Sequence, residues 1–151
     1  MAGITSKSLY DTDFVEWTAQ TARLLRAGRT AEVDLAHLAE EIEDLGKRDR
    51  WAVYSHMERL LLHQIKRRIQ PDRETASWRR SIFNSQGQIT HRLEDSPSLE
   101  DFLVRKLPDI YRRAVRGALI ETGLKPAPLP DRCPFTLDQL INQFDLEWPS
   151  E

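Results

Sequence analysis

The side chains best suited to acid–base or metal chemistry gather in one acidic stretch, residues 32–44, which contains no Lys or Arg. Carboxylates on a helix can bind a metal ion or transfer protons, and a histidine lies one turn before one of them. We call this stretch the acidic face, and its candidate residues are His37, Glu40, Glu41, Glu43 and Asp44.

A second interpretation of the acidic face is a solvated or partner-binding surface. Glu43 precedes Lys47 by four residues, and Asp44 precedes Arg48 by the same spacing. This order favours ion pairs on an exposed helix. We prefer this interpretation to a ligand site.

The second set of candidate residues lies in a basic tract, residues 66–80, in which six Lys and Arg side chains outnumber Asp72 and Glu74 and accompany Trp78. Arginines and an aromatic ring near the start of a helix can hold a phosphate or stack on a base. We call this tract the basic corner, and its candidate anion- or partner-binding residues are His63, Lys66, Arg67, Gln70, Arg73 and Arg79.

Surface pairing or partner docking is the alternative for the basic corner, because arginine stems often cover a helix while their charges stay in water. The basic neighbours of His63 repel a cation and favour the neutral imidazole. Because these charges repel one another, we expect carboxylates of this chain or of a neighbouring subunit, or a bound anion, among them.

Other catalytic patterns are missing from the sequence. No two histidines have the His-x-x-x-His spacing, and Asp34-x-x-His37 is only a weak variant of the Glu-x-x-His motif of di-iron bundles. Cys133 precedes a proline and has no histidine near it in sequence. There is no nucleophile elbow and no glycine-rich phosphate loop. The sequence therefore predicts no catalytic residue, metal ligand or cofactor.

Helices must position these side chains, because the apolar residues recur at steps of three and four and none alternates. We expect a first helix after Asp11 or Thr12 that ends at Gly28. The next helix begins at an Asp34 cap and continues through Gly46 to about Ile69, before a proline. Its predicted core positions are Leu35, Leu38, Ile42, Leu45, Asp49, Ala52, His56, Leu60 and His63.

Three more helices are expected in the second half of the chain. One follows a Ser77 cap, one runs from a capping box at Ser98 to Gly123, and a short last one starts at a Thr136 capping box. The predicted fold class is therefore all-α: an irregular helical bundle organised on one long central helix, with a short C-terminal helix, over a single domain of residues 1–151.

Several segments in this order closely resemble a bacterial family known as domain of unknown function 29. They are residues 38–46 (LAEEIEDLG), 60–63 (LLLH), 70–71 (QP) and 77–79 (SWR). Residues 10–14 (YDTDF) with Trp17 resemble the opening of that family, 96–99 (SPSL) its middle, and 121–124 (ETGL) and 133–136 (CPFT) its end. The resemblance implies a fold for nearly the whole chain and no activity.

Composition narrows the class of protein without identifying its activity. A net charge of -2 excludes a globally basic nucleic-acid binder. No apolar run approaches the ~20 residues of a membrane span, and the first residues do not resemble an export signal. We therefore expect a cytoplasmic protein without a membrane partner.

The sequence leaves three functions open. The first is a non-enzymatic protein-interaction module whose acidic and basic surfaces dock on each other in a homo-oligomer or on a protein partner. The second is a phosphate or nucleic-acid binder that uses the basic corner. The third is a metal-dependent or acid–base enzyme that uses Glu40, Glu43 and His63.

Overall fold

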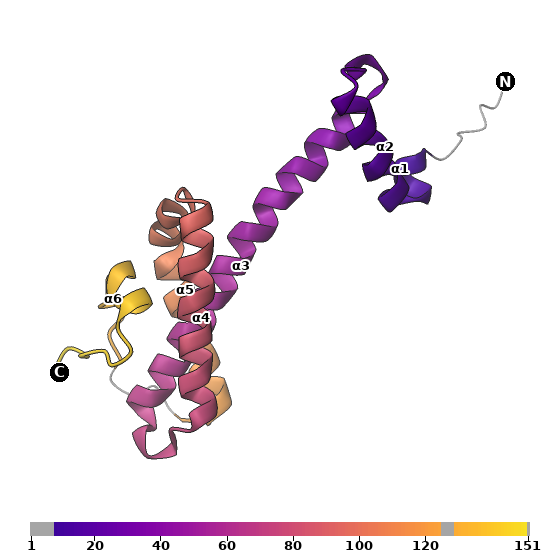
Figure 1. The fold of residues 1–151 in the computed structure, drawn as a ribbon. Coiled ribbons are helices and arrows are strands. Elements are labelled where there is room, and N and C mark those ends of the chain that lie inside the picture. Colours follow the sequence, from indigo (N-terminus) through magenta and orange to yellow (C-terminus); the bar gives the residue numbers. More distant parts are fainter. Residues whose placement is uncertain (1–7, 125–128, 151) are drawn as a thin grey trace. The chain divides into compact units, whose positions relative to one another are not determined.

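The computed structural model describes residues 8–124 and 129–150, which form helices and short 3₁₀ turns but no strand. The all-helical fold predicted from the sequence is confirmed (Figure 1). The chain divides into two compact units: unit 1 is Met1–Lys47 and unit 2 is Arg48–Glu151. The long helix α3, Leu35–Ile69, contributes residues to both units. The prediction of one domain over the whole chain stays a prediction.

Unit 1 begins with the short helix α1, Leu9–Thr12, followed by α2, Phe14–Arg26, and a 3₁₀ turn, Thr30–Glu32. The residue that caps α2 is Asp13, whose carboxylate accepts a hydrogen bond from the Glu16 amide at 3.0 Å. The predicted caps Asp11 and Thr12 are wrong, because residues 9–12 form the separate turn α1. Gly28 follows α2 with a φ of 71°, a left-handed conformation that suits glycine, as expected of a residue that ends a helix.

Helix α3 has the bounds predicted for the long helix. The Asp34 carboxylate accepts a hydrogen bond from the His37 amide at 3.2 Å, so Asp34 caps the helix. The helix continues through Gly46 and ends at Ile69, before Pro71 starts a 3₁₀ turn, Pro71–Arg73.

The predicted core face of α3 is wrong along most of its length. Leu35, Ile42 and Leu45 are 61%, 60% and 59% exposed, and Asp49 is also exposed. In unit 2 the buried residues of α3 are Val53, Tyr54, Met57, Leu60, Leu61, Gln64 and Ile65, of which Leu60 alone was predicted. Burial in the main core begins only at Val53, so the first half of the predicted face has no core to cover.

Unit 2 is an irregular helical bundle organised on α3. Its other helices are α4, Ala76–Asp95, α5, Leu99–Thr122, and the short α6, Leu137–Asn142. Figure 1 shows α4 and α5 beside the second half of α3. A Cβ atom on Gly117 of α5 would lie 3.3 Å from a methyl carbon of Leu62, so the absence of a side chain there allows close packing against α3.

The ends of these helices correct two of the predicted caps. Thr75, and not Ser77, caps α4 by accepting a hydrogen bond from the Trp78 amide at 3.3 Å. Ser98 precedes α5 without a side-chain capping bond, so no capping box forms there. The capping box between Thr136 and Gln139 is confirmed, and Gly123 ends α5 with a φ of 67°.

The inward faces of α4 and α5 carry apolar residues. Ile82 and Ile89 of α4 are buried, as are Leu103 and Ile110 of α5. These residues form one core cluster with α3, α6 and the segment after α6, residues 143–150, which we call the C-terminal strap. Its apolar side chains that pack on the cluster are Phe144, Leu146 and Trp148.

Candidate functional site

The basic corner lies in unit 2, where Arg67 of α3 holds the C-terminal strap. One Nη of Arg67 donates to the Gln64 side-chain oxygen at 3.1 Å and to the Phe144 carbonyl at 3.0 Å. The other Nη donates to the Asp145 carboxylate at 2.7 Å, and the Nε donates to Glu74. The guanidinium carbon also lies 4.3 Å from the centre of the Phe144 ring.

These contacts fix the charge of Arg67. Burial opposes the charged guanidinium, but the hydrogen bonds to Asp145 and Glu74 outweigh it, and the pKa of Arg67 is raised. The Gln64 side chain is almost fully buried and donates to the Phe144 carbonyl at 2.8 Å. The two side chains therefore anchor the strap to α3.

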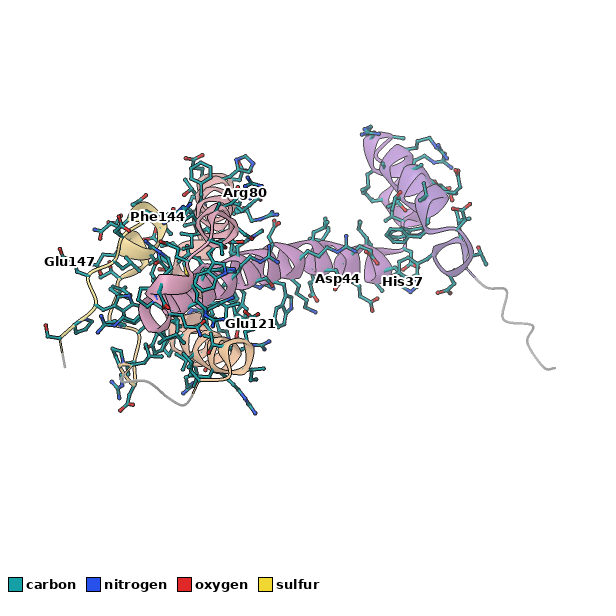
Figure 2. The ribbon with its side chains drawn as sticks, turned by 90° about the horizontal axis from the view of Figure 1, so that it is seen from below. His37, Asp44, Arg80, Glu121, Phe144 and Glu147 are labelled. Carbon is teal, nitrogen blue, oxygen red and sulfur yellow. The ribbon has the colours of Figure 1, made fainter. Side chains whose placement is uncertain are left out.

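Two other cations of the basic corner also have carboxylate partners in the same chain. Lys66 Nζ lies 2.9 Å from Glu121, a residue of α5 labelled in Figure 2, and 4.5 Å from the centre of the Trp78 ring. An Arg79 Nη lies 3.9 Å from Glu74. The expectation of carboxylates among these charges is confirmed.

The remaining candidates of the basic corner make fewer contacts. Arg73 is exposed and forms no ion pair with any residue that the structure describes. Gln70 is half-buried, and its backbone carbonyl accepts from the Arg73 amide at 3.0 Å. His63 Nδ1 donates to the Arg59 carbonyl at 2.9 Å, and burial, together with nearby Lys66, lowers the pKa of the imidazole. A neutral His63 agrees with the sequence interpretation.

An open pocket of about 270 Å³ adjoins the basic corner. Arg67 and Arg68 line it, but so do the carboxylates Glu74 and Asp145. The positive charge that a phosphate would need is therefore partly compensated within the chain. Whether this corner binds an anion or a partner stays a prediction.

The acidic face belongs to unit 1 and begins with a contact between α1 and α3. The Tyr10 hydroxyl donates to the Glu41 carboxylate at 2.5 Å, and the Tyr10 ring stacks on the His37 ring with centroids 4.0 Å apart. His37 Nδ1 lies 2.5 Å from the Asp34 carboxylate, and this hydrogen bond raises the pKa of His37 and lowers that of Asp34. His37 and Glu41 therefore join two helices.

The other members of the acidic face point to a surface role. Glu40 and Glu43 are exposed. The ion pair present is Asp44–Lys47, at 3.9 Å, and not the predicted Glu43–Lys47 and Asp44–Arg48 pairs. Helical neighbours lie three as well as four residues apart, so Lys47 has both carboxylates within its range. No group of three or more His, Cys, Asp or Glu residues suited to a metal ion occurs in the part of the chain that the structure describes.

The residues of the enzyme hypothesis fall in different units: Glu40 and Glu43 in unit 1, and His63 in unit 2. Sequence analysis did not identify Gln64, Glu121, Phe144 or Asp145 as parts of the basic corner. Gln64 could have been identified from the sequence, because it is a polar residue between the apolar Leu61 and Ile65. The others are far from the corner in sequence, and only the tertiary fold brings them there.

The fold and these contacts define an all-helical protein in which α3 carries an acidic and a basic group of side chains. The model of the family described as "Domain of unknown function DUF29" matches residues 9–145, and the chain belongs to this family. Comparison with curated proteins and with solved structures gave no match. Among the described helices, none is both long enough and apolar enough to cross a membrane.

Proposed function

We propose that this chain is a non-enzymatic, cytoplasmic protein-interaction module and that unit 1 carries its docking surface. The supporting observation is the exposure of Leu35, Ile42 and Leu45 on one side of α3, each more than half exposed. We call these three residues the apolar face of unit 1.

The size of the unit 1 core supports this proposal. Within the described part of unit 1, the buried side chains are Trp17, Thr21 and Val33. Folded units of this size have little core to stabilise them, and a contiguous exposed apolar surface commonly marks a binding site. A partner on the apolar face would remove it from water and stabilise the unit.

The basic corner indirectly supports the proposal that the docking surface lies on unit 1. Carboxylates of the same chain already pair with Lys66, Arg67 and Arg79. These charges are thus less available to an external partner than the carboxylates of Glu40 and Glu43, which are exposed.

Site-specific photo-crosslinking in living cells tests this function. A photoreactive residue at Leu45 should give a discrete adduct, whereas the same residue at Ile120, which is 73% exposed on α5 of unit 2, should give none. Mass spectrometry then identifies the crosslinked chain. Equal labelling at both positions, or none at Leu45, would contradict the proposal.

A further inference from the structure

The apolar face of unit 1 has the residue spacing that fits a second helix. Its three residues are exposed, and the half-buried Leu38 lies between Leu35 and Ile42 in sequence. The four follow one another at steps of three, four and three, which are the a and d positions of a two-helix contact. The next a position is Asp49, which lies 3.5 Å from Arg92 of α4. The open stripe therefore ends before Asp49 and is about 15 Å long, at 1.5 Å per residue.

Carboxylates flank this stripe. Asp34 and Glu41 each come directly before an a position, so they occupy g positions at the edge of the contact. The hydrogen bond to His37 lowers the pKa of Asp34, which is therefore ionised at neutral pH. The Tyr10 hydroxyl donates to Glu41, and this bond raises the pKa of Tyr10 to about 12, so the proton stays on the tyrosine and Glu41 keeps its charge. Glu43 is exposed and adds a further carboxylate beyond the other edge.

Unit 1 as a whole is acidic. It holds nine Asp and Glu residues against five Lys and Arg, whereas unit 2 holds fifteen against seventeen. Three cations of unit 1 already pair with carboxylates of the same unit: Arg23 with Glu16, Arg29 with Glu32, and Lys47 with Asp44. The field at the stripe is therefore negative, and positive charge on a partner favours both its approach and its register.

The same charges make other occupants of the stripe unfavourable. Residues 34–44 include no Lys or Arg. Two copies of this chain joined through the stripe would therefore set carboxylates against carboxylates. Anionic lipids and nucleic-acid phosphates would be repelled at this place for the same reason. A basic partner satisfies both the apolar residues and the charges beside them.

We propose that the partner of unit 1 is a basic amphipathic helix of another protein, which packs on the apolar face and sets Lys and Arg side chains beside Asp34, Glu41 and Glu43. This inference rests on the proposed function and names the chemistry of its partner. Apolar residues at the a and d positions of the partner cover the stripe. The e positions of α3 are Ala39 and Gly46, and these small residues let the two backbones approach closely.

Fluorescence anisotropy with two synthetic peptides measures this preference on the full chain. Both are helical peptides of about 18 residues, with leucine at a and d and alanine at b, c and f. The basic peptide carries lysine at e and g, and the acidic peptide carries glutamate there. The chain should bind the basic peptide at least about tenfold more tightly than the acidic one, and salt should reduce the difference. Equal affinity for the two peptides, or no binding of either, would overturn the proposal.

Neutral variants test whether the carboxylates beside the stripe select the peptide. Glu41→Gln with Glu43→Gln removes two negative charges and keeps an acceptor for the Tyr10 hydroxyl. This variant should bind the basic peptide at least about fivefold more weakly than the wild type, as expected for two ion pairs at an exposed edge. Glu94→Gln with Glu100→Gln removes two exposed carboxylates of unit 2 and should bind like the wild type. An equal loss in both variants would show attraction to any acidic surface and refute the site.

Serine variants test the apolar contact. Ile42→Ser with Leu45→Ser should weaken binding of the basic peptide at least about tenfold, because two apolar side chains no longer leave water on binding. The control is Phe83→Ser with Ile120→Ser, since Phe83 and Ile120 are 72% and 73% exposed in unit 2, and it should bind like the wild type. Circular dichroism checks that every variant keeps its helices. Unchanged binding by the Ile42 and Leu45 variant would refute contact with the stripe.

The two proposals fail in different ways. If the photo-adduct at Leu45 holds a segment without excess Lys and Arg, or a second copy of this chain, the basic helix is refuted and the proposed interaction function stands. Photo-crosslinking that gives no adduct at Leu45 refutes both.

Discussion

Arg67→Met should loosen the C-terminal strap and lower the free energy of unfolding of unit 2. Methionine keeps the apolar stem of the side chain and removes the guanidinium. The Gln64 side-chain oxygen and the Phe144 carbonyl then lose a donor, and Glu74 loses the nearer of its two cations and keeps Arg79. A hydrogen bond to a charged group contributes about 1.5–3 kcal/mol when it is sheltered from water.

The expected loss is smaller than the sum of these contacts. The Asp145 side chain is 84% exposed, so its ion pair contributes little. Removing a partly buried guanidinium also removes the cost of its desolvation. The contacts whose loss counts most are the hydrogen bonds to Gln64, Phe144 and Glu74 and the stacking on Phe144. From these we expect a net loss of about 2–3 kcal/mol.

Urea unfolding followed by circular dichroism measures this loss, and Arg68→Met is the matched control. Arg68 is the next residue of α3, is exposed, and forms no ion pair with the residues that the structure describes, so its replacement should change stability by less than about 0.5 kcal/mol. Hydrogen exchange should show faster exchange of the strap amides in Arg67→Met alone. Equal stability of the two variants would refute the anchoring role of Arg67.

Two further predictions concern protonation and backbone conformation. NMR titration should find the pKa of His37 above the ordinary value of about 6.5 and those of His56 and His63 below it, because His37 bonds to a carboxylate and the other two are desolvated. The His37 contribution to stability is therefore full below pH ~6.5 and is lost as the pH rises through its raised pKa; a stability of unit 1 that increases over that range would contradict this. Gly123→Ala should destabilise the protein by about 1 kcal/mol, because Gly123 has a φ of 67°. Gly87→Ala should stabilise it by up to about 1 kcal/mol, because Gly87 lies inside α4 with open space around it. Thermal unfolding measures both changes, and the same sign for both would contradict this prediction.

Local signals in the sequence were sufficient to predict the longer helices and α6, but not the short α1. Asp34 and Pro71 bound the long helix, and Thr136 with Gln139 identifies the start of α6. These signals depend on residues a few positions apart, so they act the same way in any fold. They failed at Ser77 because Thr75, two residues earlier, makes the capping bond.

The core face of α3 and the contacts of the basic corner could not be predicted in the same way. Which face of a helix is buried depends on where its neighbours end, and in α3 burial in the main core begins only at Val53. The partners of Arg67 include Phe144 and Asp145, which lie more than seventy residues away. Tertiary packing determines contacts between residues so far apart in sequence, and the periodicity of apolar residues does not predict them.

The continuity of α3 across both units determines where its helical structure originates. A peptide as short as residues 35–47 is at best marginally helical in water, because the first turn must be nucleated at a cost that later turns do not bear. Residues 53–69 pack in the core of unit 2, so they supply a nucleus, and each residue added toward Leu35 needs only propagation. The acidic face is thus held helical by a template outside unit 1, and a fragment that ends at Lys47 should lose the helix while a fragment that begins at Arg48 keeps it.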